Sequence, residues 1–399
     1  MSTSGKDETR LVHAGRRPED QHGVVNTPVY RASTVLSPTL ADWEQKHKDY
    51  VAGKPGVYYG RHGTPTLAAL EEAIAGLEGG YRSMLYPSGL AACACALVAY
   101  VKAGDHVLIS DSAYGPMRRA GWRFLRRFGV EVEFYDPLIE NDKGTGAGIA
   151  ALMRPATTVV VVEAPGSLTF EMQDIPAIAA VAHRQGATVI MDNTWATPLY
   201  FKPFDHGVDV SIHAATKYIV GHSDAMLGVV TTTQAAWKPL QETHVDLGQT
   251  AGPDDVFLAL RGLRTMAVRL KQHGETGLAL AAWLAERPEV ERVLHPALPG
   301  DPGHAIWKRD FTGACGLFGV VLKPVTREKF AAFIDGLTLY GIGASWGGFE
   351  SLAMPFNPAE VRNVSKWPHA GPALRLHAGL EHVDDLIADL DAGFARLAA

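Results

Sequence analysis

The feature that most constrains this chain is a regular alternation of short apolar segments with helical segments between residues 66 and 231. The segments expected to be strands are 83–86, 106–109, 130–134, 158–162, 188–191, 208–212 and 226–231, and the helices expected among them are 89–101, 114–128, 147–153 and 175–185. Such alternation is typical of an α/β fold with a mainly parallel sheet and helices on both faces. The run 159–162 consists of four valines, which indicates a central strand of that sheet.

Two further regions flank this alternation. Residues 1–63 are rich in Gly, Pro and Thr and show little helical periodicity, so we expect an N-terminal arm that lies over another part of the molecule or over a neighbouring subunit. Residues 64–255 would form the α/β domain. Residues 256–399 would form a smaller α+β domain, with a long helix over 255–287, strands at 316–322 and 373–377, a helix at 326–336, a glycine-rich loop at 341–348 and a final helix at 383–397. A length of 399 residues agrees with two or three domains.

Composition excludes several classes of function. The net charge is −6 and no basic stripe is present, which argues against a nucleic-acid partner. The N-terminus lacks the apolar run of a signal peptide, and no apolar segment has the ~18–20 residues needed to cross a bilayer. The three cysteines are expected to be buried thiols in a reducing compartment, which predicts a cytoplasmic protein. The sixteen histidines form no ligand pattern, so no metal site is predicted.

Polar residues follow two of the expected strands at the point where each strand ends. Asp192 comes directly after 188–191, and Lys217 lies five residues after 208–212. Ligands of open α/β sheets bind outside the carboxyl ends of the strands, so these two side chains can face one pocket. A lysine amine and a carboxylate suit pyridoxal phosphate, which needs a Schiff base and an anion against its pyridinium nitrogen. A salt bridge near a sheet edge is the simpler alternative.

Three weaker signals accompany this pair. Ser88-Gly89 joins a strand to a helix, and backbone N–H groups at a helix N-terminus bind phosphate. Tyr114 follows the strand at 106–109, where its ring can stack on a planar ligand or simply pack under its loop. Arg375 lies among apolar strand residues, so it needs a carboxylate partner, which is either structural or part of a substrate.

With these signals in this order along the chain, the sequence resembles the Cys/Met-metabolism PLP-dependent enzymes, and within that family the bacterial cystathionine β-lyase branch. The most specific string is Ala215-Thr216-Lys217-Tyr218 followed by 221–224, GHSD. Supporting strings are APGS at 164–167, HPALPG at 295–300, WKRDFTG at 307–313 and SWGG at 345–348. The resemblance covers nearly the whole chain and implies an aspartate-aminotransferase-like fold (fold type I).

The resemblance also implies a coenzyme site. Lys217 would form the Schiff base with pyridoxal 5'-phosphate, Asp192 would keep the pyridine nitrogen protonated and Tyr114 would stack on the ring. The phosphate would be held by Ser88, Gly89, Leu90 and Thr216, joined across a subunit boundary by Tyr59 and Arg61. The family relationship thus predicts a dimer with shared active sites, and dimers that pair into a homotetramer.

For the substrate, the resemblance implies that Arg375 binds the α-carboxylate of an amino-acid thioether, with Ser345 and Trp346 lining the same pocket. The predicted reaction is α,β-elimination of L-cystathionine to homocysteine, pyruvate and ammonia, in methionine biosynthesis. Lys217 would be the general base, and Lys217, Tyr59 or Tyr114 would protonate the departing sulfur.

Several departures from the wider family favour β-chemistry over γ-chemistry. Many relatives have serine where this chain has Ala214, and Ser-Asn-Pro where it has 166–168, GSL. The γ-lyases that act on cystathionine typically have glutamate at the position of Ala344, and methionine γ-lyases usually have a cysteine shortly after the tyrosine, where this chain has Gly115 and Pro116. A γ-replacement or γ-elimination enzyme remains the alternative, and a non-catalytic homologue is a remote one.

Overall fold

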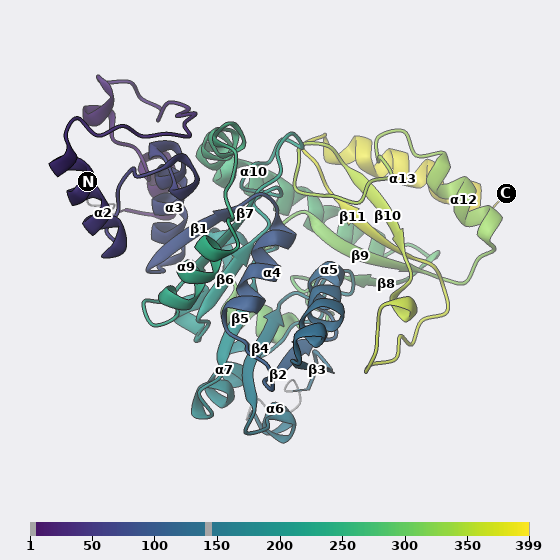
Figure 1. Cartoon of the computed structure of the whole chain (residues 1–399). Coiled ribbons are helices and arrows are strands. Elements are labelled where there is room, and N and C mark those ends of the chain that lie inside the picture. Colours follow the sequence, from purple (N-terminus) through teal and green to yellow (C-terminus); the bar gives the residue numbers. More distant parts are fainter. Residues whose placement is uncertain (1–4, 140–145, 399) are drawn as a thin grey trace.

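The computed structural model describes residues 5–139 and 146–398, so the first four residues of the expected arm lie outside it. The helices are α1 (Asp7–His13), α2 (Leu40–Val51), α3 (Pro65–Glu78), α4 (Gly89–Ala99), α5 (Gly115–Arg119), α6 (Ala147–Leu152), α7 (Ile175–Arg184), α8 (Thr197–Tyr200), α9 (Trp237–Asp246), α10 (Pro253–Ala285), α11 (His304–Asp310), α12 (Arg327–Asp335) and α13 (Val383–Ala398). The strands are β1 (Arg82–Tyr86), β2 (His106–Ser110), β3 (Glu131–Tyr135), β4 (Thr157–Glu163), β5 (Thr188–Asp192), β6 (Val210–His213), β7 (Gly228–Thr232), β8 (Val290–Leu294), β9 (Leu317–Leu322), β10 (Leu352–Phe356) and β11 (Ala373–His377). Figure 1 shows the arm at the left, the larger sheet in the middle and the C-terminal part at the right.

The larger sheet has seven strands in the order β1-β7-β6-β5-β4-β2-β3. The pairs from β3 across to β6 are parallel, whereas β7 is antiparallel to both β6 and β1. Strand β1 therefore points the same way as β6, and only β7 is reversed. The mainly parallel sheet expected from the sequence is confirmed. The carboxyl ends of all its strands except β7 lie at one edge.

Helices cover both faces of this sheet. One face packs against residues of α3, α7 and α10, and the other against residues of α4, α5 and α9, in two separate clusters of buried apolar side chains. The central strand β4 contributes Val160 and Val162 to the first cluster and Val159 and Val161 to the second. The valine run is apolar on both sides because both of its sides are buried.

The C-terminal part is built on a four-stranded antiparallel sheet in the order β10-β11-β9-β8. The end of α10, together with α12 and α13, packs against it around a third apolar cluster. Sequence reasoning identified β9 and β11 but missed β8 and β10. It also missed the short helices α9 and α11.

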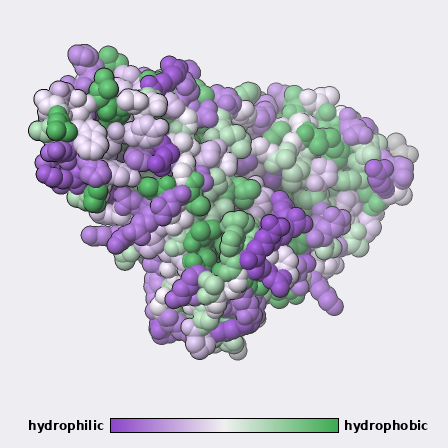
Figure 2. All heavy atoms as spheres, in the orientation of Figure 1, coloured by the Kyte–Doolittle hydropathy of each residue, from purple (hydrophilic) through white to green (hydrophobic). Residues whose placement is uncertain are grey.

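The N-terminal segment differs from the expectation of little helical structure, because it contains both α1 and α2. Helix α2 begins at the N-cap Thr39, whose side chain accepts a hydrogen bond from the Asp42 backbone N–H. No residue of α2 is buried within the chain. Large apolar side chains of this region are instead exposed: Leu36 (83%), Leu40 (72%), Val51 (71%) and Trp43 (57%). Figure 2 shows green apolar atoms at the surface over this segment at the upper left, and a larger group over α4 in the middle.

The expected helix over 114–128 is a composite of three helical forms. Helix α5 continues into a π-helical turn at Ala120–Phe124 and then a 3₁₀ turn at Leu125–Phe128. Gly121 lies in the π-helical part, and a Cβ atom there would meet Cδ1 of Ile109 at 2.6 Å, so the chain approaches β2 very closely. Among the described residues, no helix is long and apolar enough to cross a membrane.

Candidate active site

The candidate site lies at the edge of the larger sheet where all strands except β7 end. Asp192 is the last residue of β5, and its backbone pairs with Ile212 of β6. Lys217 follows β6 in a turn in which its N–H donates to Ala214 O at 3.0 Å and its own carbonyl accepts from Gly221 N at 2.7 Å. The charges of Asp192 and Lys217 act on each other's pKa, so the two sequence-predicted groups are neighbours in space.

The amine of Lys217 points toward the C-terminal part of the chain. Its Nζ donates to Ser345 Oγ at 2.7 Å and lies 5.3 Å from the ring centroid of Trp346. A Cβ atom on Gly347 would come within 3.0 Å of Lys217 Cα, so a glycine is needed where this loop crosses the lysine turn. Burial and, to a smaller extent, the charge of Arg375 lower the pKa of Lys217 to about 8 against the opposing charge of Asp192. A substantial fraction of the amine is therefore neutral close to physiological pH.

Asp192 is buried at the sheet edge and accepts two hydrogen bonds from one residue. Thr194 N–H donates to Oδ1 at 3.0 Å, and the Thr194 hydroxyl donates to the same oxygen at 2.5 Å. The hydroxyl also accepts from Ala214 N–H at 2.9 Å, which links Asp192 to the segment before Lys217. Burial raises the pKa of Asp192, while the Thr194 hydrogen bonds lower it. A cationic ring nitrogen beside this carboxylate would offset the cost of burying its charge.

A phosphate-sized anion would find its donors where β1 passes into α4. Ser88 is the N-cap of α4, and its Oγ accepts from Ala91 N–H at 3.1 Å. A Cβ atom on Gly89 would lie 2.6 Å from Cβ of Ala214, so the helix start and the lysine-bearing segment fit together only without a side chain there. The first N–H groups of an α-helix have no intrahelical acceptor, and the helix dipole favours an anion beside them.

The other two predicted phosphate ligands lie around the same turn. Leu90 is on the first turn of α4 and is exposed. The Thr216 hydroxyl accepts from Leu227 N–H at 2.9 Å and donates to Leu227 O at 3.2 Å. The residues present thus fit the coenzyme, because a lysine of lowered pKa, a buried carboxylate and a helix N-terminus with hydroxyl groups converge on one edge of the sheet.

Tyr114 lies after β2 at the same edge and is the N-cap residue of α5. Its backbone N–H donates to Oε2 of Glu163, the last residue of β4, at 2.6 Å. Its ring is about two-fifths exposed, and burial together with nearby acidic groups raises the pKa of its phenol. The phenol is therefore protonated over the whole neutral range.

Arg375 comes from β11 of the second sheet, and its charge acts on Lys217. Its Nη2 donates to the carbonyl oxygens of Ala344 and Ser345, both at 2.9 Å. Burial lowers the pKa of Arg375 to about 10, so it stays cationic at neutral pH. The structure therefore brings together Lys217 from the turn after β6, Arg375 from β11, and Ser345 and Trp346 from the loop between α12 and β10.

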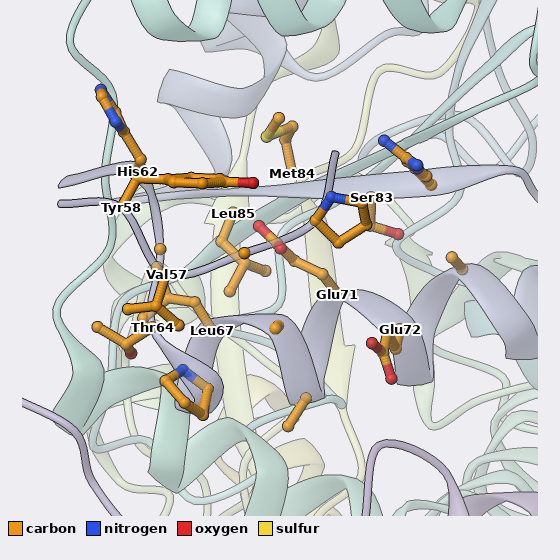
Figure 3. A pocket seen from close by; sticks show the side chains of 18 of the residues that line it. Val57, Tyr58, His62, Thr64, Leu67, Glu71, Glu72, Ser83, Met84 and Leu85 are labelled. Carbon is orange, nitrogen blue, oxygen red and sulfur yellow. The ribbon is translucent and has the colours of Figure 1, made fainter. Parts of the chain in front are cut away.

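Tyr59 and Arg61 lie apart from these residues in the single chain. Arg61 Nη1 donates to Val245 O at 3.2 Å, just before the C-terminal end of α9, and Tyr59 packs edge-on against His62 and is exposed. Arg61 and His62 line a cavity of about 660 Å³ between the arm, α3, β1 and α9. Figure 3 shows this cavity, with Glu71 of α3 directed toward β1 and the segment that carries Tyr58. The lining of this cavity includes neither Lys217 nor Asp192.

Sequence reasoning missed two residues of the site, Glu163 and Thr194. The signal for Glu163 was its place at the end of the valine strand, in register beside Asp192. The signal for Thr194 was its spacing of two residues after an aspartate, a common geometry for a local side-chain hydrogen bond. Among the residues that the structure describes, no three His, Cys, Asp or Glu side chains converge as a metal-binding group.

Comparison with known proteins agrees with this geometry. The model of the family described as "Cys/Met metabolism PLP-dependent enzyme" matches residues 8–395. The chain is 52% identical to a putative cystathionine beta-lyase of Rhizobium johnstonii, over 98% of this chain and 96% of the relative. It is 44% identical to the cystathionine beta-lyase MetC of Escherichia coli, over 98% and 99% of the two chains. The crystal structure of metB from Corynebacterium glutamicum is similar, with a TM-score of 0.87, 29% identity and 99% coverage of both chains. This chain belongs to the Cys/Met-metabolism family of PLP-dependent enzymes and has its fold.

Proposed function

We propose that this protein cleaves L-cystathionine by α,β-elimination to homocysteine, pyruvate and ammonia, as a PLP-dependent carbon–sulfur lyase of methionine biosynthesis. The observation that carries the proposal is the meeting of Lys217 and Asp192 at the ends of neighbouring strands in a chain of this family. The full-length similarity to cystathionine β-lyases supports the choice of reaction. The coenzyme, when bound, supplies an electron sink for the negative charge that develops at the substrate Cα atom.

Each residue has a distinct part in the proposed site. Lys217 holds the coenzyme and then removes the Cα proton, a task that suits an amine whose pKa is about 8. Asp192 keeps the ring nitrogen protonated, since an adjacent anion stabilises the cationic form. Tyr114 covers the ring. The phosphate is held by Ser88, Gly89, Leu90 and Thr216.

Arg375 orients the substrate. One of its nitrogens is occupied by the carbonyl groups of Ala344 and Ser345, and the guanidinium fork has further N–H groups for an α-carboxylate. Ser345 and Trp346, which contact the Lys217 amine, line the same pocket. Arg375 thus fixes the substrate beside the amine that removes its proton.

The departing sulfur needs a proton from an acid within reach. Tyr114 is suited to this step because its phenol keeps its proton at neutral pH and lies beside the site. Lys217, once it has taken the Cα proton, and Tyr59 are the other two candidates. Phenylalanine variants of Tyr59 and Tyr114 separate these two tyrosines. Only replacement of the residue that donates the proton should lower kcat strongly, and it should leave kcat unchanged for substrates with a good leaving group.

The proposed assembly is a dimer in which Tyr59 and Arg61 of each chain reach the phosphate in the other chain's site, with dimers paired into a tetramer. The exposed apolar side chains of α2 and its surroundings support a partner surface over this segment, because monomeric proteins rarely leave such a group uncovered. Arg61 would then supply the positive charge that the phosphate lacks within one chain.

The decisive experiment is incubation of the purified holoenzyme with L-cystathionine and identification of the keto acid. Pyruvate with homocysteine is the expected result. 2-Oxobutyrate with cysteine would instead identify a γ-elimination enzyme. The absence of any keto acid from a protein that binds the coenzyme would contradict the lyase assignment.

A further inference from the structure

Glu163 has no part in the function proposed above, yet it ends β4 at the same edge as the predicted coenzyme ligands. Glu163 and Asp192 are direct register partners on the parallel strands β4 and β5, which places their backbones about 4.8 Å apart. Side chains alternate along a strand, and Glu163 follows Val159 and Val161 on the face covered by α4 and α5. Asp192 follows Ile190 on that same face, so the two carboxyl groups lie side by side.

Asp192 is buried and Glu163 is half-buried, and two carboxyl groups this close do not both ionise without a compensating cation. Asp192 accepts two hydrogen bonds from Thr194, whereas Glu163 accepts a single one, from the Tyr114 backbone N–H. The negative charge is therefore better stabilised on Asp192 than on Glu163. Burial and the charge of Asp192 both raise the pKa of Glu163 well above its usual value.

The other groups around Glu163 do not reverse this assignment. Cys93 of α4 is a buried thiol whose pKa is raised by burial and by the two carboxylates. Arg118 of α5 lies on this side and its charge lowers the pKa of Glu163, against the larger effects of burial and Asp192, but its Nη2 donates to Asp111 at 2.7 Å. Tyr114 contributes its backbone N–H and a phenol that remains neutral.

We propose that Glu163 is a positioning residue held as a neutral carboxylic acid, which fixes Tyr114 over the coenzyme ring and leaves Asp192 as the single anion at the ring nitrogen. This inference rests on the coenzyme placement proposed above. The carboxyl oxygen of Glu163 anchors the start of α5 by accepting the Tyr114 N–H. Its proton prevents a second negative charge from competing with Asp192.

The test compares Glu163→Gln with Glu163→Leu in the holoenzyme. Glutamine reproduces the size, the neutrality and the acceptor oxygen of the protonated acid, whereas leucine has similar size and no acceptor. We expect Glu163→Gln to retain the coenzyme dissociation constant within about twofold and Glu163→Leu to weaken it by roughly tenfold, as expected for one lost buried hydrogen bond. We also expect the pH midpoint of the coenzyme's visible absorbance band to be unchanged in Glu163→Gln.

Infrared difference spectroscopy gives a direct readout of the proton. Wild-type holoenzyme minus Glu163→Gln, at about pH 8, should contain the carbonyl-stretch band of a protonated carboxylic acid, which an ionised carboxylate lacks. Absence of that band, or a shifted pH midpoint in Glu163→Gln, would overturn the inference. Both measurements use the glutamine variant, so they decide the matter even if Glu163→Leu does not fold.

Lys217→Ala separates this inference from the function on which it rests. If Lys217→Ala loses the visible band and Glu163→Gln shifts the midpoint, only the neutral state of Glu163 is wrong. If Lys217→Ala keeps the normal band, the coenzyme placement itself is wrong and the inference about Glu163 falls with it.

Discussion

The edge of the larger sheet and the N-terminal arm differ in which side chains they bury and which they expose. At the sheet edge, Asp192, Arg375 and most of Lys217 are enclosed by the chain's own residues, and each has a hydrogen-bond partner. In the arm, leucine, valine and tryptophan side chains around α2 are open to solvent. The sheet edge buries charged groups and the arm exposes large apolar side chains, and each arrangement has a cost in free energy.

The contrast is consistent with the proposed assembly, in which each chain forms most of a site and a second chain completes it. The buried charges at the sheet edge are arranged for a ligand that carries a cationic ring nitrogen and an anionic phosphate. The exposed apolar surface of the arm supports the proposed contact with another protein chain. The four predictions below test the two halves of this comparison, beginning with the largest expected effect.

Lys217→Ala should abolish the coenzyme's Schiff-base absorbance and lower kcat by roughly 10³-fold or more, because both coenzyme attachment and general-base catalysis depend on this amine. Absorbance of the purified holoprotein and pyruvate release measure the two effects. Lys271→Ala is the control, since Lys271 is an exposed lysine of α10 that pairs only weakly with Glu275 at 3.9 Å. Normal absorbance in Lys217→Ala would contradict the assignment at the sheet edge.

Arg61→Ala links the two regions, and it should weaken coenzyme binding by roughly 10- to 100-fold through loss of a phosphate contact. At a coenzyme concentration too low to load Arg61→Ala, mixing its chains with inactive Lys217→Ala chains should restore about a quarter of wild-type activity, because half of randomly formed dimers are hybrids and each has one intact site. If each arm served its own chain, no hybrid would contain an intact site and no activity would return. Arg17→Ala, at an exposed arginine paired with Glu72, provides the control for loss of a charge near the arm.

Arg375→Leu should raise KM for every amino-acid substrate by roughly 10- to 100-fold, because the α-carboxylate that all of them share loses its bidentate partner. Arg375→Lys keeps the charge but not the fork, so its KM should lie between those of the wild type and the leucine variant. Steady-state kinetics with cystathionine and a second β-substituted thioether measure both variants. An effect on one substrate alone would indicate that Arg375 has only a structural part.

Sequence reasoning predicted the sheet edge better than the arm, and the reason is physical. A buried strand such as β4 is easily recognised in the sequence because both of its faces require apolar residues. Asp192 and Lys217 are recognisable because charged residues at or shortly after the ends of two neighbouring buried strands need an explanation. Helix α2 was missed although Leu40, Trp43 and Val51 share one helical face, because this face packs against nothing in the described part of the chain and none of the helix is buried.

The missed strands and residues have similar causes. Strand β10 contains Pro355, which cannot donate to a ladder, and it lies at the edge of its sheet, where proline is tolerated. Strand β8 is the other edge and mixes Glu291 and Arg292 among its apolar residues. Glu163 was missed because its meaning depends on the register of β4 against β5, which no local pattern specifies.

The smallest effect concerns stability and the cavity beneath the arm, where burial raises the pKa of Glu71 to about 7. The folded-state pKa lies above the unfolded value, so between about pH 4.5 and 7 the folded protein keeps this proton while the unfolded chain loses it. The stability of the folded protein therefore falls as the pH rises through that window. Glu71→Gln removes this loss. Relative to wild type it should be nearly neutral at about pH 4.5 and more stable by about 2 kcal/mol at about pH 8, a figure reduced from the full shift because the side chain is partly exposed.

Urea unfolding at both pH values measures the difference. Glu72→Gln is the matched control, because its exposed carboxylate one residue away forms a surface pair with Arg17 and should change stability by less than about 1 kcal/mol at either pH. A pH-independent effect of Glu71→Gln would mean that folding does not raise the pKa of this carboxyl. The cavity under the arm would then be a wet, solvated space like the arm's outer surface, and burial of polar groups would be confined to the sheet edge.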